Sequence, residues 1–372
     1  MMKKPFLPEI TYMRGLCMLG VIGIHIGSYA LQNPFANVHL IAVLEILSRF
    51  AVPAFFFLSA FGLFYHTSVE DDFSYEDFMK RRIQVVLWPY IVWSLFYLLY
   101  TSFMGQTFLN LHPSAIAVNL IFGTSMYHLY FLVLLLWFYV MMPLWRWLVK
   151  AILPHAVLWL TVLFVIQVGI DYWSSYKGWS WANQYLQNYP VLSYMFSMRL
   201  NYWVIHYIWI FLLGGVFAER YEVLRDYMWR YRIILTLGFV LSIGLMLGSY
   251  YYVLDIWHYT LLEAIYTIHQ LSPMGVFYTG MGTVFFLFLF QVSPLNHTMQ
   301  AFWEQIGDTS YGMYLVHPFW LLILTSWMSK MNLTYTVVHV VALYCVAVCL
   351  SYLATLGLKQ LPKPIRRFVL GH

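Results

Sequence analysis

Long apolar runs dominate this chain and restrict the folds open to it. Ten stretches reach the length of about 20 mostly apolar residues that a helix needs to cross a bilayer. Of the 372 residues, 62% are hydrophobic and 9% are charged, whereas a soluble domain carries roughly 25% charged residues. We therefore predict an all-α, polytopic integral membrane protein with about ten transmembrane helices. The predicted spans are Ile10–Leu31, Leu44–Tyr65, Ile83–Met104, Tyr127–Leu148, Ala156–Trp173, Tyr202–Ala218, Ile233–Leu254, Met274–Val292, Tyr311–Met331 and Thr336–Leu356.

The basic residues predict how these spans are oriented. With the N-terminus inside and ten spans alternating, four basic residues fall outside, namely Arg49, Lys177, Arg199 and Lys330. The other basic residues fall inside, as the enrichment of Lys and Arg in cytoplasmic loops requires. Both termini are therefore predicted to be cytoplasmic. No small-residue cleavage site follows the first apolar run, so we expect that run to be retained as the first helix.

The distribution of charge argues against a nucleic-acid-binding protein, and the positions of the cysteines argue against a metalloprotein. The formal net charge is +5, but the basic residues form short clusters between apolar runs, so we predict no nucleic-acid partner. Cys17, Cys345 and Cys349 all lie within apolar segments and form no metal-ligand pattern, so we predict no metal site. The chain has no internal repeat, and we expect residues 1–372 to form a single membrane domain without an appended soluble domain.

Regions between the spans have their own patterns. Pro113–Thr124 and His258–Met274 are predicted to be short helices along the membrane interface. Trp173–Met198 is predicted to be the longest outer loop, and it is rich in Trp, Tyr and Asn. Such a loop suits a sugar-binding surface, because rings stack on sugars and amides bond their hydroxyls. An interfacial aromatic belt explains the same composition.

Ionisable side chains within spans are costly and therefore indicate function. Arg14 and His25 lie eleven residues apart on the first predicted helix, which is about three turns, so both face one side roughly 16 Å apart. A cation there can hold an anionic donor, and a neutral imidazole can act as a base. A snorkelling arginine and a hydrogen-bonded structural histidine remain the alternative.

A basic cluster precedes the third span. Lys80, Arg81 and Arg82 are adjacent at a predicted helix start, where cationic side chains and backbone N–H groups can hold phosphates. The same cluster can serve only to anchor the topology of the loop.

Further polar residues lie inside the predicted spans. They are Ser59 in the second, His128 at the outer end of the fourth, and Ser310, Tyr311 and His317 around the start of the ninth. His317 precedes Pro318, which loosens the helical hydrogen-bond ladder. Taken alone, each of these side chains is more often a structural polar group whose hydrogen bonds are satisfied within a helix bundle.

Taken together and in order, these segments resemble the acyltransferase 3 family of membrane acyltransferases, which modify surface polysaccharides, lipopolysaccharide and related glycans. The matching segments are the Arg–ten residues–His spacing of the first helix, PxFFFLSxFxL, the basic loop before Pro89, HLYFLxxLLxxY and SYGMYLVHP. They extend from Arg14 to Pro318. Many relatives carry a further Arg where this chain has Gln84 and Val85, and many read Ser-Gly at Ser59-Ala60.

The resemblance implies a ten-helix fold, an acyl-CoA donor (most simply acetyl-CoA, with succinyl-CoA as an alternative) entering from the cytoplasm, and no metal. It implies that Arg14 and His25 are essential and that the basic loop at Arg81 and Arg82 binds the donor. It also implies a hydroxyl acceptor on a cell-surface glycan or its lipid-linked precursor, and a multi-pass location in a bacterial plasma (inner) membrane. Membrane lipids and glycan-synthesis proteins are the expected partners.

Two points stay open from the sequence. His25 either deprotonates the acceptor hydroxyl or briefly carries the acyl group, and the oxyanion donor is one of Ser59, Ser310 and Tyr311. The alternative function is a transporter or flippase of a glycan or glycolipid, which needs no acyl-CoA site.

Overall fold

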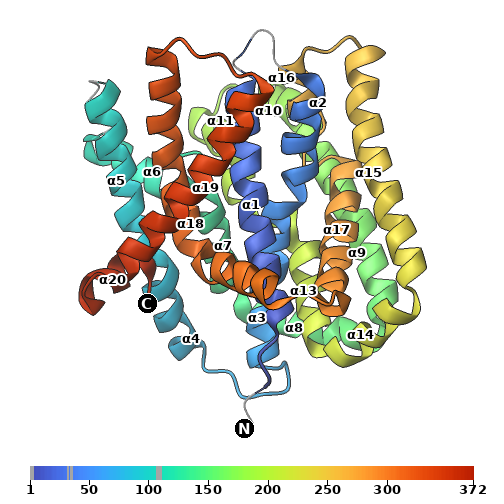
Figure 1. The fold of residues 1–372 in the computed structure, drawn as a ribbon. Helices are drawn as coiled ribbons and strands as arrows, with labels where there is room; N and C mark the ends of the chain where they lie inside the picture. The colour runs from blue at the N-terminus through green and yellow to red at the C-terminus, as the bar shows by residue number, and fades with distance from the viewer. Residues whose placement is uncertain (1–3, 32, 34–36, 106–110) are drawn as a thin grey trace.

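The computed structural model describes residues 4–31, 33, 37–105 and 111–372, and these form helices without a strand (Figure 1). The prediction of an all-α protein is confirmed. The helices are α1 (Pro8–Ala30), α2 (Val38–Ile41), α3 (Ala51–His66), α4 (Tyr75–Arg82), α5 (Trp88–Gly105), α6 (Pro113–Phe122), α7 (Tyr130–Val140), α8 (Met142–Ile152), α9 (Ala156–Tyr172), α10 (Gly178–Tyr185), α11 (Pro190–Ser197), α12 (Arg199–Tyr202), α13 (Ile208–Glu219), α14 (Tyr221–Arg230), α15 (Arg232–Asp255), α16 (Leu261–Thr267), α17 (Pro273–Val292), α18 (His297–Lys330), α19 (Val337–Lys359) and α20 (Lys363–Leu370).

Short π-helical or 3₁₀-helical segments lie between several of these helices. They are η1 (Ala42–Ile46), η2 (Leu47–Phe50), η3 (Ile83–Leu87), η5 (Leu153–His155), η6 (Trp173–Lys177) and η7 (Val204–Tyr207).

Within the described residues, 7 helical segments are long and apolar enough to cross a membrane. They are Pro8–Ala30, Val38–His66, Tyr75–Gly105, Met142–Tyr185, Arg232–Asp255, Pro273–Val292 and Val337–Lys359. Two further predicted spans correspond to the shorter apolar helices α7 and Val204–Glu219, and the ninth lies within the 34-residue helix α18. The count of ten spans and the cytoplasmic placement of both termini stay predictions.

One predicted span and one predicted loop are wrong. Tyr127–Leu148 is not a single helix, because the chain leaves helical geometry at Met141 (φ −88°, ψ 12°), just before Pro143. Pro143 starts α8 readily, since a proline at the first turn loses no helical hydrogen bond. Residues 173–198, predicted to be a loop, are largely helical in η6, α10 and α11. The predicted interfacial helices appear as α6 and the shorter α16.

Helix α1 lies at the centre of the bundle (Figure 1). In an apolar stretch of 18 residues in α1, 67% is buried inside the protein. The corresponding share is 22% in both Arg232–Asp255 and Val337–Lys359. The peripheral helices thus turn apolar side chains outward, as lipid-facing helices do. The polar residues Arg14 and His25 of this central helix line cavities between the helices.

Close helix crossings hold α1 and α3 in place. At the crossing of α1 and α18, a Cβ on Gly307 would come within 2.1 Å of the backbone oxygen of Thr11. At the crossing of α3 and α13, a Cβ on Gly214 would come within 2.3 Å of the Phe57 oxygen. Membrane helices associate through such small residues, because backbones must approach closely to gain packing energy where lipid offers no hydrophobic drive.

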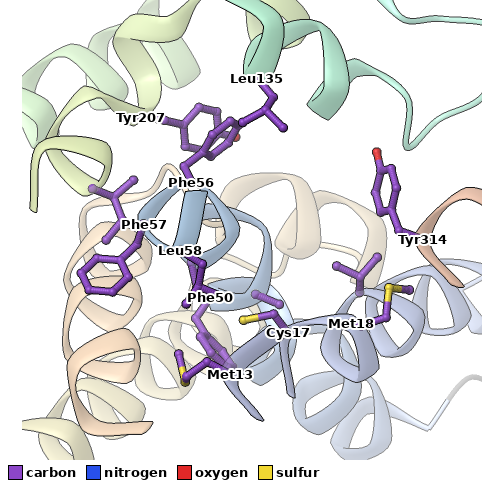
Figure 2. Close-up of a cluster of buried hydrophobic side chains, with 14 of the residues drawn as sticks. Met13, Cys17, Met18, Phe50, Phe56, Phe57, Leu58, Leu135, Tyr207 and Tyr314 are labelled. Atoms are coloured by element: carbon purple, nitrogen blue, oxygen red, sulfur yellow. The ribbon is translucent and has the colours of Figure 1, made fainter. Parts of the chain in front are cut away.

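Aromatic rings fill the space between α3, α7 and α13. The ring of Phe56 lies 4.6 Å from that of Tyr207 and 5.3 Å from that of Phe138, which stacks on Phe211 at 4.3 Å. Figure 2 shows part of this core, with Phe56 beside Tyr207 and the side chains of Met13 and Cys17 gathered near Phe50. Phe131, whose ring lies 4.7 Å from that of Phe56, lines two of the cavities described below.

The first prediction concerns the crossing of α1 and α18. Gly307→Ala should destabilise the protein by about 1–3 kcal/mol, because the added methyl group meets backbone that can move only if the helices separate. Thermal unfolding in detergent measures the effect. The matched control is Gly244→Ala on α15, where a Cβ meets nothing within 4 Å and alanine favours the helix. If Gly307→Ala unfolded at the same temperature as the Gly244→Ala control, this contact would not be what stabilises the bundle.

Candidate functional site

Three adjoining cavities run through the bundle beside α1. The basic cavity, of about 530 Å³, lies between the first half of α1, the second half of α3, and α4. The middle cavity, of about 270 Å³, shares Arg14, Ser59 and Tyr139 with it. The histidine cavity, of about 480 Å³, borders the second half of α1 and shares Phe55, Phe131 and Tyr314 with the middle cavity. The three cavities thus adjoin one another beside α1, with the smallest of them in the middle.

Arginines dominate the basic cavity. Arg81 and Arg82 come from α4, and Arg14 comes from α1. The guanidinium of Arg82 lies over the rings of Phe78 and Tyr139, 5.2 and 5.3 Å from their centroids. Such stacking holds the charge in a fixed place while leaving its N–H groups available. Asp72 and Asp77 also line the cavity, so its positive charge is partly balanced.

Lys80 lies outside the lining of the basic cavity. Its side chain is 64% exposed and pairs with Glu76 at 2.6 Å, and Lys80 is not among the residues that line the basic cavity. Its helical neighbours Arg81 and Arg82 do line that cavity, because side chains one position apart point about 100° apart around a helix. The predicted donor-binding role of Lys80 stays a prediction.

Arg146 also lines the basic cavity, and sequence reasoning treated it only as a topology signal. Its guanidinium donates to the backbone oxygens of Thr67, Ser68 and Asp71 at 2.9, 2.8 and 2.9 Å. Arg146 therefore fastens the loop between α3 and α4 and holds α4 over the cavity. No signal in the sequence separates such a clamp from an anchoring charge.

The middle cavity gathers the predicted hydroxyl groups. Ser59, Ser310 and Tyr311 line it together with Arg14 and Asp308. Ser59 Oγ lies 3.3 Å from the hydroxyl of Tyr139, and Ser310 Oγ donates to the Gly307 oxygen at 2.7 Å. The buried hydroxyl of Tyr311 has no hydrogen-bond partner among the described residues. None of the predicted oxyanion donors lines the cavity that contains His25.

Three histidines meet beside the histidine cavity, and two of them, His25 and His128, line it. His25 stacks on His317, with ring centroids 5.2 Å apart and planes at 23°. His128 lies edge-on to His317 at 5.3 Å, and Tyr127 lies 4.4 Å from His25. The sequence placed these histidines on three separate spans, and the fold brings them together.

Local backbone features position two of these rings. Pro318 has no N–H, so the Tyr314 oxygen four residues earlier lacks its helical partner. The Nδ1–H of His317 donates to that oxygen at 2.8 Å, which leaves the lone pair on Nε2. His317 Nε2 and both ring nitrogens of His128 are buried without a partner among the described residues. Gly123, at φ 68°, makes the tight turn that precedes the segment carrying Tyr127 and His128.

Sequence reasoning missed the charged pair of the histidine cavity. Arg49 was predicted to be an outer-loop charge, but it is largely buried, lines this cavity with Glu45, and forms an ion pair with it. Arg49 Nη1 also donates to Gln270 Oε1 at 3.0 Å. The available signal was the spacing of four between a Glu and an Arg inside an apolar run.

A second buried polar cluster lies beneath α10 and α11. His206 Nδ1 lies 2.7 Å from Asp171, and its Nε2 lies 3.3 Å from Ser174 Oγ. The order of groups is that of a serine triad, but Ser174 is fully buried and its Oγ accepts from Arg199 Nε at 3.0 Å. The cluster satisfies buried polar groups and ties α12 to η6. We assign it no chemistry.

No cluster of His, Cys, Asp and Glu able to hold a metal ion occurs among the described residues. The three histidines contact one another through ring faces and edges, and their nitrogens do not converge on one point.

Comparison with known proteins adds one match. The family model for the acyltransferase domain of acyltransferase 3 proteins matches residues 7–356, nearly the whole chain. No curated protein and no solved structure matches the chain. The match includes the residues that line all three cavities. The chain therefore belongs to the acyltransferase 3 family and is a membrane acyltransferase.

Proposed function

We propose that this protein transfers an acyl group, most simply acetyl and otherwise succinyl, from acyl-CoA to a hydroxyl of a cell-surface glycan or its lipid-linked precursor. The series of cavities that leads from Arg81, Arg82 and Arg14 to His25 carries the proposal. The family resemblance adds donor entry from the cytoplasm of a bacterial plasma membrane. Membrane lipids and glycan-synthesis proteins are the proposed partners.

The basic cavity suits the phosphates of CoA. Arginine presents a planar fork of N–H groups that matches phosphate oxygens. Arg82 is held by its aromatic neighbours, and Arg14 borders both the basic and the middle cavity. With the phosphates bound there, the acyl-pantetheine arm of the donor would lie in the middle cavity. The unpartnered hydroxyl of Tyr311 could donate to an amide oxygen of that arm.

The histidine cavity suits the transfer step. His25 would take the proton of the acceptor hydroxyl, whose oxygen attacks the thioester carbonyl carbon. The carbon–sulfur bond then breaks, and the CoA thiolate leaves and receives the proton. Alternatively, the His25 imidazole attacks first and carries the acyl group until the hydroxyl takes it. His317 stacks on His25 and keeps its ring in place in either route.

A transporter or flippase is the alternative function. Cavities in series also suit the passage of a solute, but the junction of the middle and histidine cavities is lined by the large rings of Phe55, Phe131 and Tyr314. A thin acyl-pantetheine arm would pass between such rings more readily than a glycan would. Binding of acyl-CoA separates the two functions.

The second prediction tests the donor site. Replacing both Arg81 and Arg82 by Ala should weaken acetyl-CoA binding by at least about tenfold, because a hydrogen bond to a charged group contributes about 1.5–3 kcal/mol. Lys150→Ala, which removes an exposed charge paired with Glu70 outside the cavity lining, is the control and should change the dissociation constant less than twofold. Binding of radiolabelled acetyl-CoA to purified protein in detergent measures both. Equal losses in the two variants would assign the basic cavity no special role, and absence of binding to folded wild type would favour the transporter.

The third prediction tests His25. His25→Ala should lower acetyl-CoA turnover by about 10²–10⁴-fold, the usual contribution of a general base. It should leave the dissociation constant for acetyl-CoA within twofold, because His25 lies in a different cavity from Arg81 and Arg82. Turnover is measured as thiol release by the purified variant. Wild-type turnover in a folded His25→Ala protein would remove His25 from the mechanism.

A further inference from the structure

The ion pair of Glu45 and Arg49 lines the histidine cavity, and the proposed transfer chemistry does not use it. The side chain of Glu45 is 1% exposed and that of Arg49 is 12% exposed. Gln270, from the segment before α17, accepts from Arg49 Nη1 at 3.0 Å. All three residues line the cavity that contains His25.

The backbone around this pair departs from a regular α-helix. Glu45 lies in the π-helical segment η1 and Arg49 in the 3₁₀ segment η2, and such irregular turns are frequent at functional sites. Helix α1 carries Gly27 opposite Glu45, where a Cβ would come within 2.9 Å of the carboxylate. A buried ion pair contributes little to stability because both ions lose their hydration. We therefore look for its role in binding.

Two atoms of the pair are incompletely satisfied. Glu45 Oε2 and Arg49 Nε are buried without a hydrogen-bond partner among the described residues. One is an acceptor and the other is a donor. A hydroxyl group can donate to the first and accept from the second, whereas a carboxylate can only accept. A buried polar group left without a partner destabilises the protein, so a ligand rich in hydroxyls is favoured here.

The charges of the cavity also favour a ligand that carries hydroxyls and no charge. Apart from its histidines, the residues that line it include one acid, Glu45, and one permanent base, Arg49. Because each compensates the other, an anionic ligand meets no free cation and would lie close to a carboxylate. At such low exposure, charge repulsion is poorly screened. Tyr29, Tyr127 and Tyr130 also line the cavity and offer hydroxyls and ring faces.

We propose that Glu45, Arg49 and Gln270 recognise the acceptor and select an uncharged sugar ring at the position next to His25. This inference rests on the proposed acyltransferase function and names the substrate class at its acceptor side. Arg49 binds acceptor hydroxyls, and Glu45 both orients Arg49 and excludes acidic sugars.

The test compares two soluble acceptors of the same size, octyl β-D-glucopyranoside and octyl β-D-glucuronide. Purified protein is kept in a detergent without a sugar headgroup, such as octaethylene glycol dodecyl ether, and is given acetyl-CoA. Acetylated glycoside is quantified by mass spectrometry. Wild type should acetylate the glucoside at least about tenfold faster than the glucuronide at equal concentration.

Substitutions then change the charge of the pair. Glu45→Gln leaves Arg49 uncompensated, so the preference for the glucoside should fall at least fivefold or reverse. Combining Glu45→Gln with Arg49→Gln removes the free cation as well as the repelling carboxylate, so the ratio should lie between those of wild type and Glu45→Gln. Glu222→Gln, from the exposed pair of Arg225 and Glu222 on α14, is the control and should leave the ratio unchanged. Acetyl-CoA binding shows that each variant is folded.

Each remaining outcome contradicts a specific step. If wild type acetylated both glycosides at the same rate, the proposed selection against acidic sugars would be wrong. The same holds if Glu45→Gln left the ratio of the two rates unchanged. A double variant that retained the ratio of Glu45→Gln would also contradict this selection. If wild type binds and hydrolyses acetyl-CoA but acetylates neither glycoside, the acceptor inference fails while the donor function stands. If it does not bind acetyl-CoA, the proposed function itself fails.

Discussion

The arrangement depends on enclosing one polar helix within the bundle. Where lipid offers no water, a cation or an imidazole in the middle of a span is tolerated only when protein or a polar cavity surrounds it. Helix α1 meets this condition because α18 crosses it at Gly307, with backbone almost in contact. Every cavity described above borders α1, so the position of that helix determines where donor and acceptor can meet.

The cavities along α1 also keep two groups of charged residues apart. Arg14 and Arg49 are both arginines within the bundle, but they lie at different cavities and with different partners. Arg14 shares its cavity with the arginines of α4, which suits phosphates. Arg49 is neutralised by Glu45, which suits hydroxyls. Between them lies the middle cavity, whose border with the histidine cavity is lined by Phe55, Phe131 and Tyr314.

Proline and glycine act here by removing specific contacts. Pro318 removes one helical hydrogen bond, and the freed oxygen of Tyr314 holds the ring of His317. Tyr314 in turn donates its hydroxyl to the backbone oxygen of His128. Two histidines from distant parts of the sequence are thus oriented through one residue of α18. The sequence indicated that Pro318 loosens the helix, but it could not show which group uses the freed oxygen.

Local pattern alone determined the class of fold, the family and the residues worth attention. Apolar runs of bilayer length leave a chain few alternatives to helices, and α1 appears as one unbroken helix carrying Arg14 and His25 as the spacing predicted. Tertiary structure decided which polar groups share a cavity. It separated Lys80 from Arg81 and Arg82, moved Ser59, Ser310 and Tyr311 away from His25, and brought Arg49 to it. Contacts between distant segments depend on how helices cross, and helix periodicity in a single segment carries no information about its neighbours.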